Sequence, residues 1–218
     1  RAWHAGEKVR LRFEILDPRT KQRVTKLQVI HEKLFHLFIV SGDLSYFDHN
    51  HPVPQPDGTL VLETVLPKAG FYRVVGDFYP EGGTPQLAVT SILSAGGAQT
   101  DFATPTLAVE AGPRKTENLT VGLRMEPAAP IAGLKTMLFF DLAPADGLEL
   151  YLGAWGHMLV ASADLIDLIH THPFLADGGP HPQFNVVFPR AGVYRIWVQF
   201  QRAAVVNTAV FTVAVKGL

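Results

Sequence analysis

The sequence has no cysteine among its 218 residues. This absence excludes disulfide bonds, zinc sites built from thiolates, iron–sulfur clusters and the thiolate-bound centre of blue-copper proteins. Charged residues are also scarce: they make up 18% of the chain, and 19 Lys and Arg against 20 Asp and Glu leave a formal net charge of -1. A nearly neutral chain has no general attraction for nucleic acid or for an anionic membrane surface, so we expect no nucleic-acid partner.

Long apolar runs and catalytic motifs are missing too. No run reaches the roughly 18 apolar residues that cross a bilayer, so we expect no membrane span. The sequence lacks a Gly-x-Ser-x-Gly elbow, a P-loop and a Gly-x-Gly-x-x-Gly turn. Because no catalytic constellation stands out, we expect a protein that is not an enzyme. The chain begins at Arg1 rather than Met, which indicates a mature or trimmed product and leaves open an anchor in a removed N-terminal segment.

An internal duplication organises what is present. Residues 36–52 align without gaps on residues 157–173, and seven of these 17 positions are identical. A second block, 67–78, aligns on 189–200 at nearly the same offset. Ordered matches of this kind indicate two copies of one domain. We place copy one at residues 1–95, a linker that can hold an extra strand at 96–117, and copy two at 118–218.

Each copy reads as a series of short strands. Period-2 alternation and β-branched or aromatic enrichment predict the strands of copy one at residues 8–16, 26–31, 34–41, 59–65, 71–78 and 86–93. In copy two they are predicted at 135–142, 147–152, 156–162, 183–188, 193–200 and 207–215. Residues 106–110 and 119–125 look like a hairpin that bridges the domains or adds strands to copy two. The fold class is therefore all-β, a tandem duplication of a Greek-key β-sandwich of immunoglobulin-like or cupredoxin-like type.

Two tyrosines support this fold. Tyr72 and Tyr194 each stand two residues after a glycine, at the opening of a late strand in their copy. This placement resembles the tyrosine corner of Greek-key sandwiches, in which the phenol bonds back to the backbone. We expect a structural role for both.

The histidines carry the chemical signal of this sequence. Of nine histidines, six fall on three matched pairs: His36 with His157, His49 with His170, and His51 with His172. Two residues apart on an extended segment, His49 and His51 point to the same face. If residues 42–45 connect two antiparallel strands, His36 lies opposite His51 and Phe38 opposite His49. The same arithmetic places His157 opposite His172, whereas a slip of one residue would break each cluster.

Three neutral imidazoles in one place suit Cu(II), Zn(II) or Ni(II). The six matched histidines are therefore predicted metal ligands, with copper as the first candidate cofactor and zinc or nickel as the others. The alternative is that they bond to backbone carbonyls and that the protein holds no cofactor. Asp43 and Asp164 are matched as well; each either orients a histidine or caps a turn, and the turn role is favoured.

The histidine blocks resemble a group of bacterial proteins. The patterns are His36…Asp43-Leu44…His49-x-His51-Pro52 and Tyr151-Leu-Gly-Ala-Trp-Gly-His157…His170-x-His172-Pro173. They are similar to those of histidine-bearing, cupredoxin-like or immunoglobulin-like domains of poorly characterised bacterial cell-envelope proteins, which are suspected of handling copper or other heavy metals. The resemblance implies a periplasmic or extracellular location and a metal role. The lack of the cysteine ligand of true cupredoxins argues against electron transfer through a blue-copper centre.

Two hypotheses follow. The first is an extracytoplasmic protein that binds copper or a similar divalent ion at one three-histidine site per domain and stores or delivers it. The second is a non-catalytic accessory or docking subunit of a larger envelope or membrane electron-transfer complex, whose histidines are structural. A positive mean hydropathy of +0.14 in a charge-poor chain motivates the second, because it leaves apolar surface for a protein partner.

Overall fold

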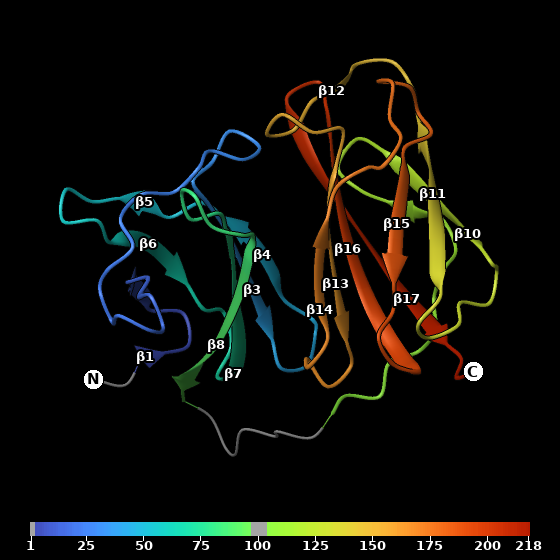
Figure 1. Cartoon of the computed structure of the whole chain (residues 1–218). Coiled ribbons are helices and arrows are strands. Elements are labelled where there is room, and N and C mark those ends of the chain that lie inside the picture. Colours follow the sequence, from blue (N-terminus) through green and yellow to red (C-terminus); the bar gives the residue numbers. More distant parts are fainter. Residues whose placement is uncertain (1–2, 97–103) are drawn as a thin grey trace. The chain divides into compact units, whose positions relative to one another are not determined.

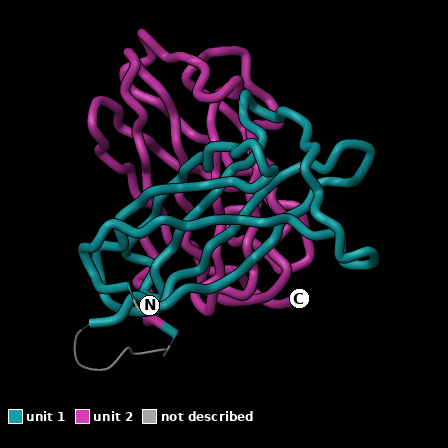
Figure 2. The backbone as a smooth tube through the Cα atoms, turned by 90° about the vertical axis from the view of Figure 1, so that its left-hand side faces the viewer, with its two compact units in different colours: residues 1–104 teal, residues 105–218 magenta. Residues whose placement is uncertain are grey.

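The computed structural model describes residues 3–96 and 104–218. The chain forms two compact units, unit 1 at residues 1–104 and unit 2 at residues 105–218 (Figure 1, Figure 2). Residues 97–103 of the predicted linker at 96–117 lie outside the described residues. Throughout the described residues the regular elements are β-strands, and none of them contains a helix of the length and apolarity needed to cross a membrane.

Unit 1 is a sandwich of two sheets. One sheet has the strand order β1-β8-β7-β3-β4 and the other β2-β6-β5. The strands are β1 Trp3–His4, β2 Lys8–Phe13, β3 Phe35–Ser41, β4 Phe47–Asn50, β5 Val53–Pro54, β6 Leu60–Val65, β7 Gly70–Phe78 and β8 Gln86–Ala95. All pairs are antiparallel except β1 with β8, which is parallel.

Unit 2 repeats this plan and extends it. One sheet has the order β12-β16-β13-β14, with β17 also paired to β16, and the other has the order β15-β11-β10-β9. The strands are β9 Arg114–Lys115, β10 Thr120–Glu126, β11 Lys135–Ala143, β12 Leu148–Glu149, β13 His157–Ser162, β14 Leu168–Thr171, β15 Gln183–Val187, β16 Gly192–Arg202 and β17 Val205–Val215. Strands β11, β13, β14, β15, β16 and β17 correspond to β2, β3, β4, β6, β7 and β8. The tandem β-sandwich predicted from the sequence is confirmed.

Some predicted strands were wrong. Residues 26–31 carry only isolated bridges, and residues 147–152 contain only the short β12 and an isolated bridge from Tyr151 to Ala154. Both segments lead into two-residue turns with left-handed backbone, at His31 (φ 49°) and Glu32 (φ 64°) and at Leu152 (φ 50°) and Gly153 (φ 70°). Two positive φ angles in succession are the mark of a type I′ turn, which closes the segment on itself.

The predicted hairpin of residues 106–110 with 119–125 was wrong as well. Strand β10 pairs instead with β9 and β11, so it adds a strand to unit 2. From residues 106–110, only Glu110 bridges a strand, through Thr212 of β17. The strand lists also omitted β4 and β14, although the histidine register already required a paired extended segment at each of these places.

Both tyrosines tie their strands to the preceding turn. The Tyr72 hydroxyl donates to Lys68 O at 2.9 Å and accepts from Lys68 N at 3.0 Å. Tyr194 repeats this with Arg190 at 2.9 and 3.2 Å, and its hydroxyl also lies 2.8 Å from Asp167 Oδ2. Burial and the Asp167 carboxylate raise the pKa of Tyr194 to about 12, because both disfavour the phenolate. These are tyrosine corners in geometry.

Candidate metal centre

Figure 1 shows the hairpins β3–β4 of unit 1 and β13–β14 of unit 2. The strand pairings place a histidine cluster at the open end of each hairpin. Phe38 is paired with His49, and Leu159 with His170. Continuing these registers by two residues places His51 across from His36 and His172 across from His157. This is the register that the sequence predicted, and it is what gathers the three rings.

The opposite ends of the two hairpins explain why the registers agree. In each, a turn closes with a backbone hydrogen bond, from Leu44 N to Ser41 O at 2.9 Å and from Leu165 N to Ser162 O at 2.8 Å. The two leucines share a left-handed backbone, with φ angles of 54° and 55°. Equal turns fix equal registers.

In unit 1 two rings converge on one nitrogen. His36 lies on β3 and is 3% exposed; its neighbours Phe35 and Leu37 belong to the sandwich core, so its ring points to the opposite face of the sheet. The Nε2 atoms of His49 and His51 each lie 3.2 Å from His36 Nδ1. The ring of His49 also stacks on Phe38, with 4.3 Å between centroids.

Unit 2 repeats the cluster. His157 is 1% exposed, and its Nδ1 lies 3.0 Å from His172 Nε2. One nitrogen from each of His157, His170 and His172 falls within 4.8 Å of the other two. The ring centroids of His170 and His172 are 4.5 Å apart. His170 and His172 are half-buried, and the Nε2 atom of His170 is itself buried.

A backbone carbonyl holds the buried ring in both units. His36 Nε2 lies 3.0 Å from Ile30 O, and His157 Nε2 lies 2.9 Å from Tyr151 O. A carbonyl oxygen only accepts hydrogen bonds, so each Nε2 carries the proton. In the neutral ring Nδ1 then carries the lone pair, and that lone pair faces the other histidines. Ile30 and Tyr151 occupy the first position of the two type I′ turns, which therefore place the carbonyls.

Some nitrogen pairs in the two clusters have nearly the spacing of ligands on one metal ion. Ligands at about 2.05 Å from a tetrahedral ion are about 3.3 Å from one another. The nitrogen pairs at 3.0 and 3.2 Å need to move by only a few tenths of an ångström to reach that separation. Fixing a ligating ring through its other nitrogen is also the usual support for a metal-bound histidine.

The two matched aspartates lie at the turn end of each hairpin, away from the histidines. Asp43 accepts from Ser41 Oγ at 2.5 Å and from Ser45 N at 3.1 Å. Burial raises the pKa of Asp43, but the hydrogen bonds outweigh it and hold this pKa well below its usual range. Asp164 has the same arrangement with Ser162 and an added ion pair to Arg190, and its pKa is also lowered. Both residues cap turns.

One histidine near the site was not predicted. The ring of His31 lies 6.4 Å from that of His36, edge to face, and it stands in the turn that supplies the Ile30 carbonyl. In unit 2 the ring of Tyr151 takes a comparable place, 5.2 Å from His157. Because the matching position to His31 is Leu152, the alignment of the copies gave no signal for it.

Fold and clusters together define a tandem β-sandwich with a matched histidine hairpin in each half. The chain belongs to the family described as "Domain of unknown function (DUF8832)", which matches residues 1–94 and 114–217. The two matches confirm the internal duplication. No curated protein matches the chain.

Solved structures resemble the chain at low identity. The fibronectin(III)-like modules of CbhA from Clostridium thermocellum share 11% identity at a TM-score of 0.28, over 99% of this chain and 89% of that one. The FN1–FN3 domains of chicken CNTN1 share 9% at 0.27, over 99% and 65%. A Ca²⁺-stabilised adhesin of an Antarctic bacterium shares 11% at 0.27, over 98% and 45%. Similarities of this size say nothing about partners or activity.

Proposed function

We propose that each unit binds one divalent transition-metal ion through its three matched histidines. In unit 1 the ligands are His36, His49 and His51. The observation that carries the proposal is the carbonyl-held histidine whose Nδ1 lone pair faces a second imidazole nitrogen at 3.0 to 3.2 Å, repeated in both units. In unit 1 the Nε2 atoms of His49 and His51 both lie 3.2 Å from this Nδ1, so a cation held between the three rings would be their shared partner.

The ligand chemistry selects the class of ion. Neutral imidazoles favour Cu(II), Ni(II) and Zn(II) over Mg²⁺ and Ca²⁺, and Cu(II) binds most tightly in this series. Three protein ligands leave at least one position for water or for a ligand from another molecule. An open site without a thiolate suits an ion that is held and passed on, so we assign the protein to extracytoplasmic storage or delivery of such an ion.

Losing a ligand should weaken binding strongly. The binding free energy of zinc at structural sites with four ligands is about 10 to 16 kcal/mol, which is about 3 kcal/mol for each ligand. One ligand removed then weakens binding by about 100-fold, and two removed abolish it at micromolar metal.

The test is metal content per chain by elemental mass spectrometry after loading with Cu(II), Zn(II) or Ni(II). We expect two ions for the natural chain and one for each double variant, His49→Ala/His51→Ala or His170→Ala/His172→Ala. These half-buried positions can be truncated without opening the core, and circular dichroism checks the fold. His181→Ala is the matched control, because His181 is exposed and paired with Asp141 at 2.8 Å. Two ions in a double variant, or none in the natural chain, would contradict the proposal.

A further inference from the structure

One strand of unit 2 has no counterpart in unit 1. Strand β10 runs along β11 and pairs with it from Thr120↔Ala143 to Glu126↔Met137. In unit 1 the corresponding sheet, β2-β6-β5, ends at β2. Among the described residues, β2 is therefore an edge strand whose outer backbone groups lie where β11 receives β10.

The missing strand leaves the unit 1 core incomplete. In unit 2, the segment at β10 supplies Leu119 and Val121 to a cluster of eighteen buried hydrophobic residues, whereas the cluster of unit 1 has eleven. Strand β8 shows the effect: Ala88 and Thr90, which face the core side of the sheet, are exposed. An exposed apolar strand beside an open edge marks a surface that another polypeptide covers.

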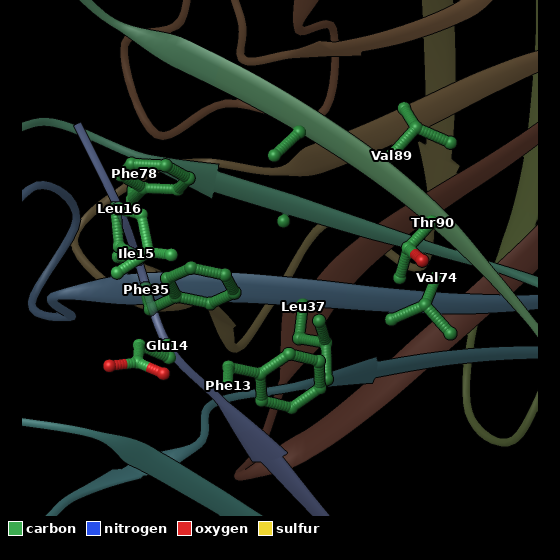
Figure 3. A pocket seen from close by; sticks show the side chains of 12 residues that line it. Phe13, Glu14, Ile15, Leu16, Phe35, Leu37, Val74, Phe78, Val89 and Thr90 are labelled. Carbon is green, nitrogen blue, oxygen red and sulfur yellow. The ribbon is translucent and has the colours of Figure 1, made fainter. Parts of the chain in front are cut away.

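A hollow of about 280 Å³ occupies this place in unit 1. The side chains of Phe13, Leu37, Val74 and Thr90 border it, between the end of β2 and the strands β3, β7 and β8 (Figure 3). The matched tyrosines Tyr72 and Tyr194 are paired with Ile92 and Val213, so Ile92 corresponds to Val213. Two positions earlier on the same strands, Thr90 therefore corresponds to Phe211, which is fully buried in unit 2. Thr90 itself is exposed.

The charge along the edge indicates what fits beside it. Lys8, Arg10 and Arg12 alternate on β2 with the buried Val9 and Leu11, so the three cations form one exposed row. On the β6 side of this row Arg12 is paired with Asp57 and Arg10 lies across from Glu63, which leaves the opposite side for a new strand. The corresponding residues of β11 are Lys135, Met137 and Phe139. A strand next to β2 would place its outward residues against this row, which favours acidic side chains there.

We propose that unit 1 binds an extended segment of a partner protein as an added strand along β2. Backbone hydrogen bonds to β2 give affinity, as in other cases of strand addition. Apolar side chains at alternate positions fill the hollow, as Val121 and Leu123 fill the corresponding space in unit 2. Acidic side chains between them face Lys8, Arg10 and Arg12.

The chain supplies its own probe. A synthetic peptide with the sequence of residues 118–127 takes the register of β10, so its positions 124 and 126 face Arg12 and Arg10. In the R124E peptide both positions are acidic, and in the E126K peptide both are basic. We expect the R124E peptide to bind the full chain at least 10-fold more tightly than the E126K peptide, with a difference that shrinks as salt rises. Replacing its Val121 and Leu123 with Ser should abolish binding.

Protein variants locate the site. Arg10→Glu should weaken binding of the R124E peptide several-fold and strengthen binding of the E126K peptide several-fold. Ala88→Glu puts a charge into the hollow and should weaken the binding of both peptides at least 10-fold. Leu87→Glu places the same charge on the other face of the strand and should leave their binding unchanged. Residues 87 and 88 are exposed, so neither variant threatens the fold.

Fluorescence anisotropy measures the affinities, and hydrogen exchange should show new protection of the β2 amides in the complex. The proposal is overturned if the R124E peptide does not bind at millimolar concentration, if the two peptides bind equally, or if Ala88→Glu and Leu87→Glu behave alike. It is also overturned if the chain dimerises through β2 in solution and the peptide cannot compete, because the occupant is then a second copy. Neither set of variants touches the histidines, so this result is independent of metal binding.

Discussion

The turn that supplies the Tyr151 carbonyl offers a way to perturb the candidate metal centre without touching a ligand. Gly153 holds a φ angle of 70° in that turn. A β-branched residue there is strained by about 1 to 2 kcal/mol, so Gly153→Val should push the turn out of its conformation. The Gly153→Asn variant is the matched control, because asparagine tolerates left-handed backbone.

The expected effect follows from the contact that the turn makes. Tyr151 O lies 2.9 Å from His157 Nε2, and moving it by about 0.6 Å takes it beyond hydrogen-bond distance. His157 then loses the partner that fixes its proton on Nε2. Losing such a support typically costs 10- to 100-fold in metal affinity. We expect a loss of this size for Gly153→Val and less than a threefold change for Gly153→Asn.

Competition with a chromophoric zinc chelator measures the affinity, in the His49→Ala/His51→Ala background so that only unit 2 binds. Thermal unfolding of the metal-free chains verifies that the variants remain folded. Equal zinc affinities in the Val and Asn variants would refute the idea that the carbonyl prepares His157 for metal. The same substitution with unit 1 intact should leave the affinity of the unit 1 site unchanged.

Three further predictions concern the fold. Tyr194→Phe should lower the free energy of unfolding of unit 2 by about 3 kcal/mol, and Tyr72→Phe that of unit 1 by about 2 kcal/mol, because only Tyr194 also bonds a carboxylate; equal losses in urea titrations would contradict this. Asp164→Asn should lower the free energy of unfolding of unit 2 by about 1 kcal/mol at pH 7. Because the folded-state pKa of Asp164 lies below its ordinary value of 3.8, this contribution is present above about pH 4 and is lost as the pH falls further, so the natural chain and variant should converge in acid. Gly76→Ala should destabilise unit 1 by about 1 to 3 kcal/mol, since the new Cβ would lie 2.3 Å from Phe35 Cζ; hydrogen exchange should show faster opening of unit 1 alone.

Much of the histidine geometry could be predicted before the structure. The duplication was visible because seven positions match without a gap, and the register followed from the period-2 geometry of strands and a short turn. Those are local properties, decided within about 17 residues of sequence. The turn caps and tyrosine corners are local in the same way, since each phenol bonds a residue four positions earlier.

The tertiary structure decided what depends on distant pairing. Which carbonyl reaches His36 or His157 depends on a two-residue turn that reads as strand by composition. Whether residues 119–125 pair with residues 106–110 or with β11 depends on which sheet edge is open, and neighbouring residues carry no record of that. The sequence by itself thus determined the repeated sandwich and the gathering of three histidines in each half. Only the tertiary structure showed the carbonyls that hold two of those rings and the open edge of unit 1, because both arise from contacts between segments that are not adjacent along the strand pattern.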